Sequence, residues 1–154
     1  MSNLLRILLV LCAPVLLGSC ATSAYRSAWA QYEVDDEPIG LAGRWEGTWK
    51  SDWNGHEGKL RCLMTPIEEP EGGEGGYSAW FHSTFAVVLS FQYETVFTVV
   101  DASSGLLRFQ GQEDLGSVAG GVYRYDGTVE GDRFHATYTA ENGDHGVFEM
   151  RRQR

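Results

Sequence analysis

Cysteine is scarce in this sequence of 154 residues, which contains only Cys12, Cys20 and Cys62. The first two stand in or just after an apolar N-terminal segment, so Cys62 is alone in the rest of the chain. An internal disulfide is therefore not expected. Cys62 lies in LRCLM, and its apolar neighbours predict a buried thiol that packs as a small hydrophobic side chain. A reactive thiol, the alternative, would need an accessible and electropositive setting.

Positive charge is also in short supply. The chain has 12 lysines and arginines against 21 aspartates and glutamates, which gives a net charge of −9. A surface this acidic repels phosphate backbones and anionic lipid head groups. We therefore expect no nucleic-acid partner, and attachment to a membrane would need an anchor other than a basic surface.

A hydrophobic run long enough to cross a bilayer as a helix is missing as well. The apolar stretch from Ile7 to Leu17 is interrupted by Pro14 and falls short of the roughly 20 residues that a spanning helix needs. Arg6 precedes the stretch and small residues follow it, which is the layout of a secretory signal. We therefore exclude this segment from the fold.

The signal ends in Leu17-Gly18-Ser19-Cys20, which resembles the bacterial lipobox. In that motif the cysteine is acylated and becomes the mature N-terminus. The resemblance implies that residues 1–19 are a lipoprotein signal peptide cleaved before Cys20, and that lipid on Cys20 makes the membrane a partner. Ala21 favours the outer membrane, so we expect a cell-envelope lipoprotein. The alternative is an ordinary signal peptide cut near Ala21 or Ala24.

Helical periodicity is absent beyond Gly43. Glycines recur there, and apolar residues alternate in short runs between turn signals, which is typical of an all-β chain. Residues 20–42 show no sustained period, and we interpret them as a lipid-anchored tether. Residues 43–152 are long enough for one domain. Eight strands joined as consecutive hairpins are predicted near 43–51, 57–66, 76–85, 90–101, 105–112, 119–130, 133–141 and 145–152, and they form an antiparallel up-and-down barrel.

The register of the sixth and seventh strands follows from their turn. A two-residue turn at Gly131-Asp132 pairs Val129 with Phe134 and Tyr125 with Tyr138, so that apolar residues meet on one face. The same turn pairs Glu130 with Arg133 on the other face. Opposite charges then lie together in solvent.

The last hairpin contains Asn142-Gly143, which resembles a two-residue turn. That register would set Phe148 beside Thr137 and send core residues to both faces of the strand. We therefore predict a three-residue loop, Asn142-Gly143-Asp144. This loop pairs Tyr138 with Phe148, Ala136 with Met150, and Phe134 with Arg152.

The first strand contains two of the tryptophans that stand four residues apart in GRWEGTWKSDW. Trp45, Gly47 and Trp49 share one face, and charged or polar residues occupy the other. Trp53 belongs to the following turn and is expected at the rim. By the same alternation, the inner face of the barrel is predicted to be aromatic: Trp45, Trp49, Phe91, Tyr93, Phe97, Phe109, Tyr123, Tyr125, Phe134, Tyr138 and Phe148.

The start and the end of the domain carry a family resemblance. A domain that opens with Gly43-x-Trp45, has eight sequential hairpin strands and ends with an inward-facing arginine resembles the calycins, the lipocalin and avidin type of barrel. In lipocalins an arginine of the last strand packs across the tryptophan of the opening motif. The resemblance implies that Arg152 closes the barrel against Trp45 by a cation–π contact. The run from Gly146 to Arg152 also resembles the ends of a group of bacterial secreted proteins that begin with GxWxGxW.

Motifs for catalysis or cofactor binding are missing. The histidines, at 56, 82, 135 and 145, have no close ligand spacing, so no metal or cofactor is expected. Calycins include haem-binding barrels, and by that resemblance His82 would be a candidate axial ligand. However, His82 lies on the face of its strand opposite Tyr77 and Phe81, which predicts a surface residue. Glu46, Asp126 and Glu149 face outward, so no inward carboxylate pair is available for acid–base catalysis. We therefore expect a protein that is not an enzyme.

Two functions remain open. An eight-stranded barrel is wide enough to hold one small ligand, or it is filled by its own side chains. If it binds a small apolar or amphipathic molecule, the expected site is Trp49, Tyr93, Tyr123, Tyr125 and Tyr138, because the buried tyrosine hydroxyls need partners. If its core is solid, the protein is a non-enzymatic envelope interaction module whose partner contacts its acidic loops.

Overall fold

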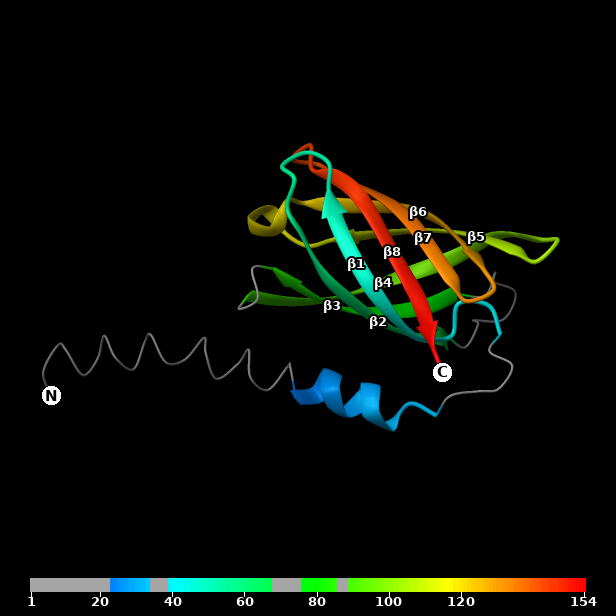
Figure 1. Ribbon diagram of the computed structural model, residues 1–154. Helices are drawn as coiled ribbons and strands as arrows, with labels where there is room; N and C mark the ends of the chain where they lie inside the picture. The colour runs from blue at the N-terminus through cyan, green and yellow to red at the C-terminus, as the bar shows by residue number, and fades with distance from the viewer. Residues whose placement is uncertain (1–22, 34–38, 68–75, 86–88) are drawn as a thin grey trace, which may run out of the picture. The chain divides into compact units, whose positions relative to one another are not determined.

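A computed structural model describes residues 23–33, 39–67, 76–85 and 89–154 of the chain (Figure 1). The expected signal peptide and Cys20 lie outside these residues. The chain divides into two compact units, residues 1–32 and 33–154. None of the helices that the structure describes is long and apolar enough to cross a membrane.

The first unit contains a helix over residues 23–31, within the predicted tether of residues 20–42, whose sequence shows no sustained period. Tyr25 and Trp29 stand one helical turn apart, and their rings stack with centroids separated by 5.9 Å. Side chains four residues apart face one another on a helix, and such a pair stabilises it. A single pair of this kind is too short a pattern to reveal a helix by its period.

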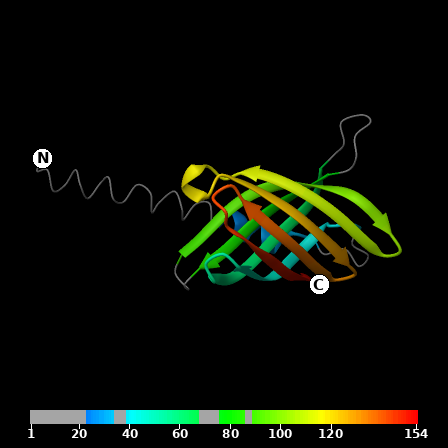
Figure 2. The ribbon, with the colours of Figure 1, turned by 90° about the horizontal axis from the view of Figure 1, so that it is seen from above.

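The second unit confirms the predicted all-β fold. Eight antiparallel strands form a closed barrel in sequence order, with β1 hydrogen-bonded to both β2 and β8 (Figures 1 and 2). The strands are β1 (Gly43–Ser51), β2 (Glu57–Ile67), β3 (Gly76–Phe85), β4 (Leu89–Ser103), β5 (Leu106–Asp114), β6 (Val122–Glu130), β7 (Arg133–Ala140) and β8 (His145–Gln153). Inward and outward side chains alternate along each strand, which is why the period-two pattern was sufficient to find all eight of them.

The predicted start of the sixth strand at residue 119 is wrong. Residues Ser117–Ala119 form a short 3₁₀ helix, η1, and β6 begins only at Val122. Gly120 and Gly121 separate the two elements with φ angles of 109° and 81°. An extended strand cannot contain this left-handed backbone, so the two glycines end the pattern.

The register predicted for β6 and β7 is confirmed, since Glu130 pairs with Arg133 and Tyr125 with Tyr138. The pairing predicted for β7 and β8 is wrong by two residues. Ala136 pairs with Phe148 and Phe134 with Met150, instead of Ala136 with Met150 and Phe134 with Arg152. Likewise, Tyr138 pairs with Gly146 and not with Phe148. The error preserves parity, so the residues predicted inward are still inward.

Gly143 explains the shift. The Ala140 amide donates to the Asp144 carbonyl at 2.7 Å, and the Gly143 amide donates to the Ala140 carbonyl at 3.0 Å. The loop therefore has three residues, as predicted, but they are 141–143. A three-residue hairpin loop commonly ends with a residue in the left-handed region, and Gly143, at φ 93°, occupies that position.

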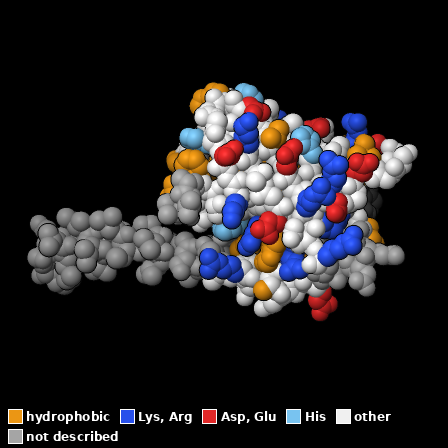
Figure 3. Space-filling view, in the orientation of Figure 1, with side chains coloured by type: hydrophobic (Ala, Val, Ile, Leu, Met, Phe, Trp, Pro, Cys, Tyr) orange, Lys and Arg blue, Asp and Glu red, His pale blue; other side chains and the backbone are white. Residues whose placement is uncertain are grey.

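The two ends of the barrel differ. One end, which we call the open end, carries the β1–β2, β5–β6 and β7–β8 loops, and η1 lies there (Figure 1). The opposite end, the closed end, carries the β4–β5 and β6–β7 turns and the entry of the chain into β1. On the outer face around β1 and β8, acidic and basic side chains are interspersed (Figure 3). Among the ion pairs on the outside of the barrel are Glu46–Arg61 and Asp132–Arg151.

Candidate ligand-binding site

The middle of the barrel is filled by aromatic rings. Trp45, Phe81, Phe97 and Phe109 are fully buried, and Phe134 is nearly so. Neighbouring rings in this group have centroids between 4.7 and 6.5 Å apart, the range in which aromatic pairs attract each other. A ligand therefore has no path through the barrel, and a site inside it has to lie near one end.

The closed end is sealed by side chains. The guanidinium carbon of Arg152 lies 4.2 Å from the centre of the Trp45 ring, so the contact expected between them is present. Arg152 also donates hydrogen bonds to the carbonyls of Gly40, at 2.8 Å, and of Ala42. The Trp45 indole donates to the carbonyl of Leu41 at 2.9 Å, and the Leu41 side chain is fully buried. Residues 40–42 thus cover the end of the barrel, and the Leu41 side chain is part of its core.

The open end contains a cup of about 220 Å³. Its wall is largely aromatic, and among the described residues it contains a single carboxylate, that of Asp144. The lining residues are Trp49, Leu60, Ser83, Phe91, Tyr93, Leu115, Ala119, Tyr123, Tyr138, Asp144 and Phe148. Seven of the eight strands, all except β5, contribute side chains to this lining, so the site is held by the rigid part of the fold.

Four of the five predicted ligand-binding residues line this cup: Trp49, Tyr93, Tyr123 and Tyr138. Tyr125, the fifth, lies deeper and is only 3% exposed. The Tyr125 hydroxyl is buried. Burial raises its pKa, and the interaction with the neighbouring Tyr93 hydroxyl lowers it by less.

The hydroxyl groups of the cup are held in their protonated form. Burial raises the pKa of Tyr93 and Tyr125 well above the ordinary value. Burial also raises the pKa of Tyr123 and Tyr138, and the nearby Asp144 carboxylate raises both further. Neutral phenols are donors as well as acceptors of hydrogen bonds, so the cup offers polar handles beside its ring faces.

Asp144 is fixed in place by two hydroxyl groups. The Ser51 hydroxyl donates to its Oδ1 at 2.6 Å, and the Tyr138 hydroxyl donates to the same oxygen at 3.3 Å. Ser51 is itself completely buried. The carboxylate is therefore oriented at the rim of the cup, although Asp144 is a loop residue in the predicted register.

Asp144 was missed because of the register error. In the observed register it continues the inner-face series of Gly146, Phe148 and Met150. Placing the glycine of the loop at its left-handed position would have revealed this. The other residues missed at the site (Leu60, Ser83, Phe91, Leu115, Ala119 and Phe148) are inner-face or loop positions that a strand pattern alone cannot assign to the mouth.

The β5–β6 connection shapes one side of the cup. The Tyr123 hydroxyl donates to the Ala119 carbonyl at 3.0 Å, which ties η1 to β6. The Asn142 amide donates to the Gly120 carbonyl at 3.3 Å and connects this loop to the β7–β8 hairpin. Ala119 lines the cup, while its neighbour Val118 is fully exposed. Of these two adjacent residues, Ala119 therefore faces the cup and Val118 faces solvent.

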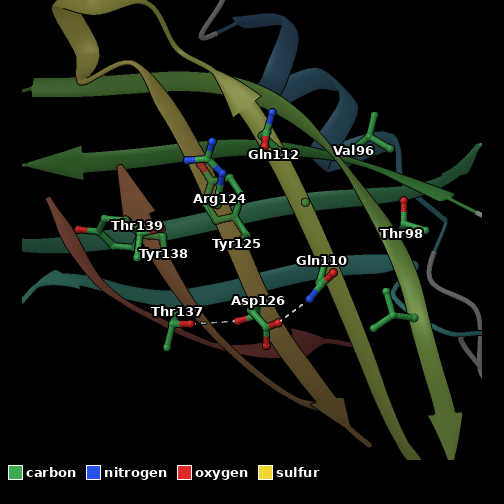
Figure 4. Close-up of a pocket in the computed structure, with 12 residues that line it drawn as sticks. Val96, Thr98, Gln110, Gln112, Arg124, Tyr125, Asp126, Thr137, Tyr138 and Thr139 are labelled. Carbon is green, nitrogen blue, oxygen red and sulfur yellow. Dashed lines mark hydrogen bonds between the residues drawn. The ribbon is translucent and has the colours of Figure 1, made fainter. Parts of the chain in front are cut away.

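A larger hollow, of about 660 Å³, lies on the outer face of β4–β7 (Figure 4). It is an open trough, in which the Gln110 side chain donates a hydrogen bond to Asp126 at 2.9 Å. Its apolar part consists of Val96 and Val100, which are about half exposed. The inner cup is the better candidate for a small ligand because several rings and one oriented charge converge there.

Cys62 is completely buried, as predicted, and burial raises the pKa of its thiol. His56, His135 and His145 are exposed. His82 lies on the outer face of β3, because the buried residues of that strand, Ala79 and Phe81, occupy the alternate positions. No group of three metal-ligating side chains occurs in the described part of the chain. Glu46, Asp126 and Glu149 make their contacts on the outside of the barrel.

Comparison with known proteins adds little to this geometry. No protein-family model matches the chain, and no curated protein does. Among solved structures, a de novo designed fluorescence-activating β-barrel is similar. It shares 20% sequence identity over 78% of this chain and 100% of the design, with a TM-score of 0.49. The chemistry of the open end therefore has to indicate the function by itself.

Proposed function

We propose that the protein is a calycin-like, lipid-anchored module of the cell envelope that binds a small apolar or amphipathic ligand. The observation that supports this is the cup at the open end, which collects rings from five strands above a filled core. A barrel that served only as a solid scaffold would gain stability by closing this space with side chains, since packed interiors leave few voids.

The size of the cup limits the ligand. Sites for drug-sized molecules enclose roughly 300–1,000 Å³, and this cup encloses about 220 Å³. It therefore holds a small molecule or one end of a larger one whose remainder extends into solvent. Trp49, Tyr93 and Tyr123 supply the apolar contacts, and the tyrosine hydroxyls orient polar groups.

Binding in the cup is tested by filling it. Ala119→Trp places an indole into the space, while Val118→Trp adds the same indole to the solvent side of η1 and serves as the control. With benzyl alcohol as probe, we expect a Kd on the order of 1 mM or weaker for so few atoms. The NMR signal of the Trp49 indole N–H, which donates to the Thr84 carbonyl, reports the binding.

The probe should shift this signal in the wild type and in Val118→Trp, and should leave it unchanged in Ala119→Trp. The site is misassigned if Ala119→Trp responds as the wild type does. Native mass spectrometry of protein extracted from its own membrane would then identify any ligand that copurifies.

Attachment to the envelope rests on Leu17-Gly18-Ser19-Cys20. Cys20→Ala should move the protein from the detergent-extracted membrane fraction to the soluble fraction, because one acyl chain contributes about 0.8 kcal/mol for each buried methylene group. Cell fractionation and a mass measurement of the N-terminus check this. If the Cys20→Ala protein still needs detergent for release, the anchor lies elsewhere.

A second candidate is a non-enzymatic envelope protein that uses the barrel's outer surface to bind a partner. The filled middle of the barrel and the exposed Val96 and Val100 on the outer trough favour it. In either case we propose that the protein acts by binding and not by catalysis, because Asp144 is the single carboxylate among the described residues of the cup and has no lysine or histidine beside it there.

A further inference from the structure

The aromatic rings that line the cup come from several strands. Trp49, Phe91, Tyr93, Tyr123 and Tyr138 all line the cup. Their hydroxyl groups, where present, remain protonated because burial raises the pKa of these tyrosines. The rings are therefore neutral π systems with a negative electrostatic potential on their faces. Groups of such rings attract organic cations, above all methylated ammonium ions, because these lose little hydration free energy on leaving water.

Asp144 adds a full negative charge to this ring of aromatics. Both of its hydrogen bonds, from Ser51 and Tyr138, end on Oδ1, and Oδ2 takes neither of them. The bond from Tyr138 also connects the carboxylate directly to one of the cup's rings. A cation in the cup would thus contact ring faces and, at the rim, an oriented carboxylate oxygen.

The remaining lining residues leave this charge uncompensated. No lysine, arginine or histidine occurs among the described residues that line the cup. A neutral ligand that covers the rim would remove water from the carboxylate without replacing it, which costs free energy. An anion would be repelled by Asp144 and by the chain's net charge of −9.

We propose that the cup selects an organic cation, with a methylated ammonium group seated among Trp49, Tyr93, Tyr123 and Tyr138 beside Asp144. This inference rests on the ligand-binding function proposed above and narrows its ligand class. The volume of about 220 Å³ suits the ammonium head group of a molecule, and the rest of the molecule leaves through the mouth.

The test compares two probes that differ in one atom. Choline carries a trimethylammonium group, and 3,3-dimethylbutan-1-ol has the same shape with carbon in place of nitrogen. NMR titration of the full chain, read at the Trp49 indole, should show choline binding at least about tenfold more tightly. Asp144→Asn keeps an oxygen acceptor for Ser51 and Tyr138, and it should reduce this preference to about threefold or less.

Asp52→Asn is the matched control, since Asp52 is an exposed carboxylate at the same end of the barrel that does not line the cup. It should leave the preference unchanged. Equal reductions in the two variants would show a diffuse effect of net charge and overturn the assignment to Asp144.

The outcomes separate this inference from the proposed function. If benzyl alcohol and the neutral isostere bind as tightly as choline, the cup is a ligand site, but the inference that it prefers cations is wrong. If none of the probes binds, both proposals fall. Vesicles of phosphatidylcholine form a further arm: a response to choline alone indicates a free solute, and a response to both allows a lipid head group as the source.

Discussion

Replacing Gly47 with alanine is expected to disrupt the closure of the barrel. Gly47 lies in β1, where it pairs with Leu60 of β2 and with Met150 of β8. A Cβ atom on Gly47 would lie 2.7 Å from the Met150 Cα and 2.8 Å from the carbonyl carbon of Glu149. These are backbone atoms of the adjacent strand, and they cannot rotate away as a side chain can.

The strain has to be relieved by moving β8 away from β1. This seam joins the first strand to the last, so a displacement there affects the hydrogen bonds that close the barrel. We expect Gly47→Ala to lower the free energy of unfolding by roughly 3 kcal/mol or more. The midpoint of thermal unfolding, followed by circular dichroism, should fall by about 10 °C.

Gly76→Ala provides the control. Gly76 lies in β3, and the nearest atom to a Cβ placed there is 3.6 Å away, an ordinary contact distance. Alanine is preferred over glycine in a strand that has room for it, so stability should stay the same or rise slightly. Similar losses in both variants would mean that the cause is strand propensity and not the close approach of β1 to β8.

The sequence was informative about the barrel because its geometry repeats. Inner and outer positions alternate along each strand, and side chains such as Phe97, Phe109 and Phe134 mark the inner face. Parity survives an error of two residues, so the wrong pairing of Ala136 still placed Phe148 inside. The composition of the core therefore follows from local patterns alone.

The site was only partly predictable because it depends on where strands end. Trp49, Tyr93, Tyr123 and Tyr138 were found from parity, whereas Asp144 was assigned to a loop. Its position is set by a single glycine conformation, at Gly143, which shifts the hairpin by two residues in pairing. Burial of Leu41 was missed for a similar reason, because only the closed barrel shows that the entering chain covers its end.

Arg152→Ala, close to the end of the chain, is expected to cause the other large loss. The Arg152 guanidinium stacks on Trp45 and donates to the carbonyls of Gly40 and Ala42. A cation–π contact contributes about 0.5–2 kcal/mol, and a hydrogen bond from a charged group about 1.5–3 kcal/mol. Truncation also leaves two carbonyls without their donor, so we expect a loss on the order of 3 kcal/mol.

Arg151→Ala is the control at the adjacent position. Arg151 points outward, and its ion pair with Asp132, at 3.3 Å, joins side chains that are 64% and 48% exposed. Ion pairs this exposed contribute little, so stability should change by no more than about 0.5 kcal/mol. The two variants remove the same charge from neighbouring residues, and the comparison isolates the inward contacts.

Arg152→Lys separates charge from geometry. Lysine keeps the positive charge near Trp45 but lacks the planar fork that reaches two carbonyls at once, so it should recover only part of the lost stability. Thermal unfolding of the three variants ranks them: Arg151→Ala near the wild type, then Arg152→Lys, then Arg152→Ala. If Arg152→Ala and Arg151→Ala unfold at the same temperature, the last residues are a frayed basic tail, and the contacts of Arg152 with Trp45 add no stability. If Arg152→Lys unfolds at the same temperature as the wild type, the positive charge alone is sufficient for stability, and the two hydrogen bonds to residues 40 and 42 add none.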